Sequence, residues 1–96
     1  MGRPGFVMAN HRRGRTYVGV TSDLAKRAWE HRNGLGSDYT KEHRCYRLVW
    51  FETSDDIQAA RARELQMKKW KREWKIELIE KDNPEWNDLY ESTQWN

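Results

Sequence analysis

The sequence of 96 residues predicts one small domain of the mixed α/β (α+β) class. Short runs rich in β-branched and aromatic residues predict strands at 5–9, 16–20 and 46–52. The segments 24–32 and 57–79 lack Gly and Pro and carry helix-forming residues, so they predict helices. We expect a single core spanning about residues 5–90 of the 1–96 chain and no second domain.

The first half of the chain predicts a β-hairpin followed by a helix. The polar turn 10–15 contains Gly14 and separates the first two strands. Thr21, Ser22 and Asp23 follow the second strand and supply side-chain oxygens for a helix N-cap. The helix then covers Leu24–Arg32 and ends at Asn33-Gly34.

The second half predicts a polar loop at 34–45, a strand at 46–52 and a long helical region. The first helix of this region should begin after 53–56 and cover 57–70. The helical pattern continues through Ile79, with a break or exposed corner between two helices at 68–72, and it ends at Asn83-Pro84. Trp70, Trp74 and Leu78 repeat every four residues, which predicts a stripe facing the core. We expect a short helix or turn at 85–90 that holds the C-terminus through Trp86 and Leu89, and loose ends at 1–4 and 92–96.

Composition indicates a lean core under a highly charged surface, with 36% hydrophobic and 34% charged residues. The six Trp should supply much of the buried area. No apolar run reaches the ~20 residues of a membrane span, and the N-terminus shows no export signal. The one cysteine, Cys45, can form neither an intramolecular disulfide nor a Cys-rich zinc site, so we expect a cytoplasmic protein.

Positive charge gathers in the first half of the chain, where ten Lys and Arg face four Asp and Glu. This distribution fits polyanion binding, although a solvated surface would explain it better if it were the only evidence. The candidate nucleic-acid contacts are Arg12, Arg13 and Arg15 in the hairpin turn and Lys41, His43 and Arg44, near Tyr39, in the 34–45 loop. The three turn arginines can also serve only to keep the hairpin tip soluble.

Four polar residues on periodic elements could form a hydrolytic site: Tyr17, Arg27, His31 and Glu64. Arg27 and His31 lie four apart and share one helix face. A guanidinium matches the oxygens of a phosphate, and a single carboxylate such as Glu64 suffices to hold a Mg²⁺ whose other ligands are water and substrate. In this hypothesis Tyr17 accepts a proton from the attacking water, and His31 relays the proton or orients the water.

Each of these residues also has a plain structural interpretation. Tyr17 can be a strand aromatic, and Arg27 a solvated residue paired with Asp23. His31 can help to close the C-terminal end of its helix, where a cation is favoured. Glu64 can pair with Lys68 across one turn. Composition and spacing leave both interpretations open.

At these positions the sequence resembles the GIY-YIG nuclease superfamily and is most similar to its small stand-alone bacterial members. The second motif is Tyr17-Val18-Gly19, the motif Arg is Arg27, the position four later is His31, and the metal-binding Glu is Glu64. The resemblance covers about Gly5 to Tyr90 and matches the late motif Asn to Asn83. It implies a three-stranded antiparallel sheet flanked by helices, and cleavage of DNA with Mg²⁺ or Mn²⁺ held by Glu64. Tyr17 would be the base, and Arg27 would bind the phosphate.

The first motif is Gly5-Phe6-Val7 here, and it departs from the family pattern because Phe6, eleven residues before Tyr17, stands at the position of the family's first Tyr. Phe keeps the ring and loses the hydroxyl, which could cost a general acid–base contribution of ~10²–10⁴ in rate. The leading hypothesis is therefore a metal-dependent endonuclease acting on DNA, including branched or damaged DNA in repair. The alternatives are a binding module with weak or no catalysis, and a protein-interaction domain that uses exposed Trp. Since we expect no targeting domain, selectivity would come from the loop, from an unidentified protein partner or from a distorted substrate.

Overall fold

The computed structural model describes residues 5–53 and 56–94. In this part of the chain the elements are β1 Gly5–Ala9, β2 Thr16–Val20, α1 Leu24–Arg32, α2 Asp38–His43, β3 Arg47–Glu52, α3 Ile57–Lys68, α4 Arg72–Asp82 and the 3₁₀ helix η1 Tyr90–Thr93. The expectations for 1–4, 54–55 and 95–96 lie outside the described residues. None of the described helices is long and apolar enough to cross a membrane.

The three strands form one antiparallel sheet in the order β2-β1-β3, which confirms the predicted sheet. In the β1–β2 pair, Phe6 lies opposite Gly19 and Met8 lies opposite Tyr17. Because directly opposite residues of an antiparallel pair point to the same side, these four residues share one face of the sheet.

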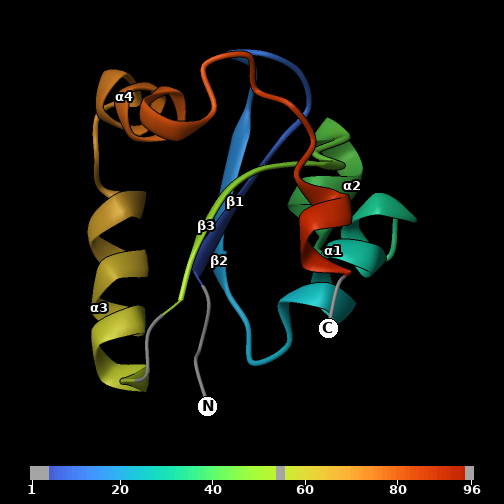
Figure 1. Ribbon diagram of the computed structural model, residues 1–96, viewed down its shortest axis with the longest axis horizontal. Helices are drawn as coiled ribbons and strands as arrows, with labels where there is room; N and C mark the ends of the chain where they lie inside the picture. Colours follow the sequence, from blue (N-terminus) through green and yellow to red (C-terminus); the bar gives the residue numbers. More distant parts are fainter. Residues whose placement is uncertain (1–4, 54–55, 95–96) are drawn as a thin grey trace.

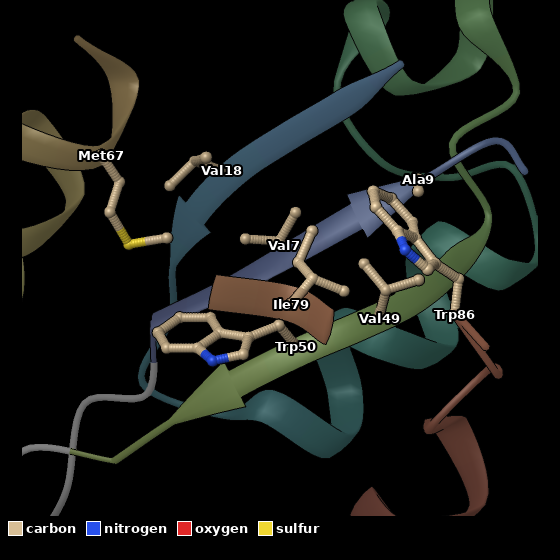
Figure 2. Close-up of a cluster of buried hydrophobic side chains, with 8 residues drawn as sticks. All are labelled: Val7, Ala9, Val18, Val49, Trp50, Met67, Ile79 and Trp86. Atoms are coloured by element: carbon tan, nitrogen blue, oxygen red, sulfur yellow. The ribbon is translucent and has the colours of Figure 1, made fainter. Parts of the chain in front are cut away.

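Helices cover both faces of the sheet, as Figure 1 shows, with α3 and α4 on one side and α1, α2 and η1 on the other. Figure 2 shows the core under α3 and α4, where Met67 of α3 and Ile79 of α4 meet Val7, Val18 and Trp50. The second core lies under α1 and consists of Phe6, Met8, Ala28, Cys45 and Leu48. The sheet therefore separates α1 from α3.

The predicted loop at 34–45 is wrong in part, because it contains the helix α2. Ser37 begins this helix as its N-cap, and its side chain accepts a hydrogen bond from the backbone N–H of Thr40. Arg44 ends it in the left-handed region, with φ 56°. Only Thr40 is buried in the helix, so no apolar periodicity signals it in the sequence.

The predicted Trp70–Trp74–Leu78 core stripe is wrong at Trp74, whose surface is 51% exposed. The helix α3 ends at Lys68, two residues earlier than expected, and α4 begins at Arg72. Trp70 therefore lies in the break between the two helices and shares no continuous helical register with Trp74. Trp70 and Leu78 pack against the core only in part.

The tryptophans also supply less of the buried area than expected. Trp86 and Trp50 are buried, whereas Trp29 is exposed like Trp74. In Figure 2 the indole of Trp86 lies over Ala9. The core is therefore completed by aliphatic strand residues and by Met67 rather than by a full set of indoles.

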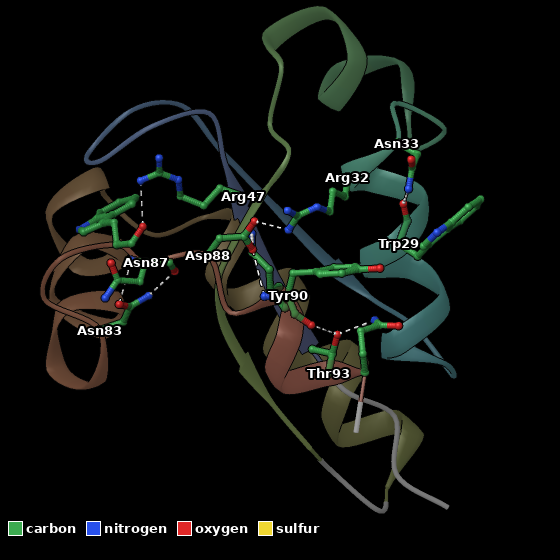
Figure 3. Close-up of polar contacts among 12 residues, drawn as sticks. Trp29, Arg32, Asn33, Arg47, Asn83, Asn87, Asp88, Tyr90 and Thr93 are labelled. Carbon is green, nitrogen blue, oxygen red and sulfur yellow. Dashed lines mark hydrogen bonds and ion pairs between the residues drawn. The ribbon is translucent and has the colours of Figure 1, made fainter. Parts of the chain in front are cut away.

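The C-terminal segment is tied to the sheet, as Figure 3 shows. The Asp88 carboxylate accepts hydrogen bonds from the backbone N–H groups of Leu48 and Tyr90, and it pairs with Arg32 at 3.0 Å. The backbone N–H of Leu89 donates to the Leu48 carbonyl. The expectation of a loose end from residue 92 was wrong for 92–93, because these residues belong to η1.

Candidate active site

The β2–α1 unit positions three of the four predicted catalytic residues. Tyr17 lies in β2, half-buried on the face that packs under α1. Asp23 starts α1 at the predicted place, since its side chain accepts a hydrogen bond from the Lys26 N–H. Arg27 and His31 follow on α1. The short strand-to-helix connection thus brings the phenol and the imidazole together from consecutive elements.

The ring of Tyr17 lies within a cluster of aromatic side chains. Its centroid is 5.7 Å from that of His31, 6.3 Å from that of Phe6 and 6.1 Å from that of Tyr39. Tyr39 in turn packs against His43 at 4.5 Å. Phe6 contacts His31 at 5.6 Å, so the ring at the first motif position supports both predicted catalytic rings.

Gly19 is required by this cluster. A Cβ atom at this position would lie 2.6 Å from Cζ of Phe6 and 3.1 Å from Cε2 of Tyr17. Real Cβ atoms do not approach carbon so closely, so any side chain here displaces the two rings. The motif glycine therefore lets Phe6 and Tyr17 lie against the β2 backbone.

His31 is 2% exposed and has one polar partner, Thr40. The distance from its Nδ1 to the Thr40 hydroxyl oxygen is 3.2 Å, and that hydroxyl donates its own hydrogen to the Ser37 carbonyl at 2.8 Å. Since the only hydroxyl hydrogen is used, the Thr40 oxygen accepts a hydrogen bond from Nδ1–H. This network assigns the proton of the neutral imidazole to Nδ1 and leaves the lone pair on Nε2.

The environment of His31 favours that neutral form. Burial lowers the pKa of the imidazole, the positive charge of Arg27 lowers it further, and Glu30 acts in the opposite direction. A group whose pKa lies below its ordinary value of 6.5 is uncharged at neutral pH. At neutral pH the His31 imidazole is thus uncharged, and it is not the cation that would serve merely to close a helix C-terminus.

Arg27 points to solvent beside a polar hollow at the start of α1. Thr21, Asp23, Lys26 and Glu30 also line this hollow. Arg27 pairs with Glu30 at 3.5 Å, so the pairing with Asp23 expected in the structural interpretation was wrong. The side chain is 43% exposed, and an exposed pair of this kind contributes little to stability. Its guanidinium is therefore free to bind a phosphate.

Glu64 approaches the sheet from the other side. It lies on α3 and pairs with Lys68 at 3.8 Å, as its structural interpretation expected. Its carboxylate lines a narrow hollow together with Phe6, Gly19 and Glu52. This hollow includes neither Tyr17, Arg27 nor His31. Phe6 and Gly19 are the residues common to the surroundings of Glu64 and of the aromatic cluster.

The two groups of predicted catalytic residues thus meet at Phe6 and Gly19, which line the hollow of Glu64 and lie against the ring of Tyr17. The residues at 5–53 and 56–94 contain no group of three or more His, Cys, Asp or Glu that could hold a metal ion. The donor set near Glu64 consists of hard carboxylate oxygens, with Glu52 in the same hollow. Such a set fits Mg²⁺, which keeps several waters and needs only one or two carboxylates.

The predicted nucleic-acid contacts fall into two groups. Arg13 donates two hydrogen bonds to Glu80, at 2.8 and 2.9 Å, and Arg12 pairs with Glu85 at 3.8 Å. The Arg13 guanidinium, followed by the indole N–H of Trp86, lowers the pKa of Glu80 to about 2. Arg12 and Arg13 therefore connect the hairpin tip to the C-terminal half.

The second group consists of the remaining candidates, Arg15, Lys41, His43 and Arg44. The Arg15 side chain has no carboxylate partner within the described ranges. Lys41 and Arg44 are exposed on and after α2. His43 is half-buried and lies 3.9 Å from the Glu42 carboxylate, in addition to its contact with Tyr39.

Asn83 is held in a structural position. It is buried, and its amide nitrogen donates to the carbonyls of Val49 and Asn87, as Figure 3 shows in part. Its amide oxygen accepts from the Asn87 N–H. With both ends of the amide occupied, Asn83 fastens the turn after α4 to β3.

Sequence reasoning missed Thr40 and the partnership of Tyr39 with Tyr17. The signal for both was Ser37, which has the side chain of an N-cap three residues before Thr40. A helix starting there carries Tyr39 and Thr40 back over β2. Glu52 was also missed, because a charged residue at the end of a strand is an ordinary feature of exposed edges.

Comparison with known proteins agrees with this architecture. The family model for the GIY-YIG catalytic domain matches residues 6–77. A UPF0213 protein of Syntrophus aciditrophicus is 43% identical over 70 residues, which cover 72% of this chain and 79% of that protein. A UPF0213 protein of Haloquadratum walsbyi is 41% identical over 64 residues, or 67% and 72% of the two chains.

The fold also matches the solution NMR structure of a UPF0213 protein from Bacillus halodurans. The TM-score is 0.57 at 24% identity, with 93% of this chain and 94% of that chain covered. The family model implies a nuclease family whose substrates are nucleic acids. The chain belongs to the GIY-YIG catalytic domain family, and its relatives named above are UPF0213 proteins.

Proposed function

We propose that this chain is a divalent-metal-dependent endonuclease that hydrolyses phosphodiester bonds in DNA, including branched or damaged DNA during repair. The observation that carries the proposal is the contact between Tyr17 and a buried, neutral His31, one turn from the exposed Arg27. Hydrolysis requires a group that removes a proton from water and a positive charge that balances the phosphoryl oxygens. The β2–α1 unit offers both.

Tyr17 takes the proton of the attacking water in this proposal. To accept that proton the phenol must give up its own, which the Nε2 lone pair of the neutral His31 imidazole can take while Thr40 keeps Nδ1 protonated. The packing of Phe6 and Tyr39 around Tyr17 fixes the orientation of the phenol. These contacts limit the motion of the reacting side chain.

Arg27 binds the scissile phosphate. Its pair with Glu30 is long and solvent-exposed, so a phosphate can replace the carboxylate at small cost. A guanidinium donates two parallel hydrogen bonds to phosphate oxygens and keeps its charge at any working pH. Arg27 therefore supplies positive charge that balances the negative charge on the phosphate oxygens.

Glu64 would hold Mg²⁺ or Mn²⁺. The ion, when bound, supplies Lewis-acid stabilisation of charge on the phosphate oxygens. The weak pair with Lys68 leaves the Glu64 carboxylate able to accept a cation, and Glu64 lines the same hollow as Phe6 and Gly19, which lie against the aromatic cluster. A cytoplasmic setting and an additional protein partner remain predictions.

Phe6 favours a second candidate, a nucleic-acid-binding module without turnover. Its ring occupies the first motif position without a hydroxyl and contacts both Tyr17 and His31. If the chain is an impaired nuclease, Phe6→Tyr raises the cleavage rate constant, by up to ~10². A binding module cleaves neither before nor after this substitution.

The test is cleavage of supercoiled plasmid and of a branched duplex by the purified protein, with Mg²⁺ or Mn²⁺ and with a chelator. Glu64→Gln should reduce metal-dependent nicking by at least ~10²-fold with an unchanged thermal midpoint. Glu73→Gln, an exposed carboxylate in the first turn of α4, is the matched control and should cleave as the parent does. Nicking that is unaffected by Glu64→Gln, or absent with every metal, contradicts the proposal.

A further inference from the structure

A second hollow lies beside the candidate active site, where the start of β2, the helix α2 and the break between α3 and α4 come together. We call it the cationic hollow, and it is lined by Arg15, Thr16, Tyr39, Trp70, Arg72 and Lys75. Ile76 and the fully buried Trp86 complete its wall. It is open to solvent and combines basic and aromatic side chains.

The cationic hollow has three positive charges and no carboxylate among its lining residues. Arg15, Arg72 and Lys75 also form no ion pair within the part of the chain that the structure describes. Arg12 and Arg13, on the same hairpin tip as Arg15, are both paired with acids. The positive charge of the hollow is therefore uncompensated, in contrast to that of its neighbours.

Backbone contacts hold Arg72 in place without neutralising it. Its guanidinium donates hydrogen bonds to the carbonyls of Gly14, at 3.0 Å, and Arg13. A carbonyl carries no net charge, so the guanidinium remains a fixed cation at the edge of the hollow. Burial lowers the pKa of Lys75, and repulsion by Arg72 lowers it further. An anion bound between them would relieve this repulsion.

The aromatic members connect the hollow to the active site. Tyr39 is 38% exposed, and the centroid of its ring lies 6.1 Å from that of Tyr17. Trp70 is half-buried and packs edge-on against Trp74, at 6.3 Å. Exposed rings beside unpaired cations are the combination that binds nucleotides, because bases stack on the rings while phosphates contact the cations.

We propose that the cationic hollow binds the nucleic-acid strand next to the cleaved phosphodiester. Arg15 and Lys75 contact phosphates, and a base stacks on Tyr39 or Trp70. The location relative to the cleaved bond rests on the proposed function, whereas binding by the hollow does not require catalysis. Its position next to Tyr17 gives the strand a continuous path from the phenol, across Tyr39, to the α3–α4 break.

The test measures binding of a fluorescein-labelled oligonucleotide, single-stranded and duplex, by anisotropy in the presence of a chelator. Lys75→Ala and Arg15→Ala should each weaken binding at least threefold and reduce the slope of log affinity against log salt by ~0.7–0.9. Lys81→Ala removes the same charge from the same helix outside this hollow and should leave affinity within twofold. Equal effects of Lys75→Ala and Lys81→Ala would overturn the proposal, since they would indicate only general charge attraction.

Stacking is tested at Tyr39. Tyr39→Leu should weaken binding by about tenfold, within the range of one lost base–aromatic stack, whereas Tyr39→Phe should keep parental affinity. Thermal midpoints of both variants establish that they fold. Indistinguishable affinities of the Leu and Phe variants contradict the stacking. The binding assay contains a chelator and no metal, so a failed nuclease assay does not affect its results. Cleavage that depends on Glu64 likewise does not support the cationic hollow if these variants bind as the parent does.

Discussion

The Nδ1 atom of His31 lies 3.2 Å from the hydroxyl oxygen of Thr40, in the interior between α1 and α2. Gly36 makes this approach possible, since a Cβ there would lie 2.3 Å from Nδ1 and 2.7 Å from the hydroxyl. The residues that close around the imidazole thus come from a segment of polar, small side chains. Through Thr40, this segment determines which ring nitrogen of His31 carries the proton.

Thr40→Val should allow the neutral His31 imidazole to adopt both tautomers. Valine keeps the shape of the side chain and removes the acceptor, so the Nδ1–H form loses the hydrogen-bond partner that it has among the described residues. In ¹⁵N-edited NMR spectra the parent and Thr40→Ser should show a single Nδ1–H tautomer, whereas Thr40→Val should show a mixture. Identical imidazole spectra of Thr40→Val and the parent would refute this assignment.

The stability of the chain should depend on pH through His31. Because the folded pKa is lowered, the unfolded chain binds more protons below about pH 6.5, and the free energy of unfolding decreases as the pH falls below that value. Urea unfolding between pH 8 and pH 5 measures this dependence. His31→Phe should reduce the slope of stability against pH in this window, and an unchanged slope would mean that other groups cause it.

Gly19→Ala should destabilise the fold. The new methyl group would overlap Phe6 and Tyr17, and overpacking of this kind costs about 1–3 kcal/mol. Gly5→Ala is the matched control, because its nearest neighbour lies at 3.9 Å and the substitution should leave stability unchanged or raise it by up to about 1 kcal/mol. Urea denaturation compares the two, and equal effects would show that packing around Gly19 is not special.

Arg13→Ala should lower the thermal midpoint at pH 7 and make the chain less sensitive to acid. In the parent, the lowered pKa of Glu80 contributes stability that is present above about pH 4.5 and is lost as the pH falls toward 2. Without Arg13 that contribution is smaller. Arg12→Ala removes a long pair between exposed side chains and the smallest of the contributions that lower the Glu80 pKa, so it should change both properties much less than Arg13→Ala. Calorimetry at pH 7, 4.5 and 3 distinguishes the two variants.

Local sequence signals predicted the secondary structure well where they were unambiguous. The bounds of α1 agree with the expected Leu24–Arg32, because Asp23 at its start and Asn33-Gly34 at its end are strong terminal signals. The break between the last two long helices also falls where the basic run predicted it. The exposure of Trp74 was not predictable from spacing, because the break resets the helical phase between the two tryptophans.

The site was predictable only in part. The meeting of Tyr17 and His31 follows from a short connection between adjacent elements, which the sequence displays. The position of Glu64 depends on which face of the sheet α3 covers, and helix periodicity does not determine that. Thr40 and the cationic hollow depend on α2, whose polar sequence resembles a loop.

The central claim is that Glu64 holds the divalent cation of a site completed by Tyr17 and Arg27. The most direct measurement is the anomalous signal of Mn²⁺ in a crystal of the chain soaked with Mn²⁺ and a short oligonucleotide. We expect a manganese ion bound to the Glu64 carboxylate and to a phosphate of the oligonucleotide. That phosphate should also contact the Arg27 guanidinium and the Tyr17 hydroxyl. Manganese bound elsewhere, or bound at Glu64 with the phosphate out of reach of both side chains, would contradict it.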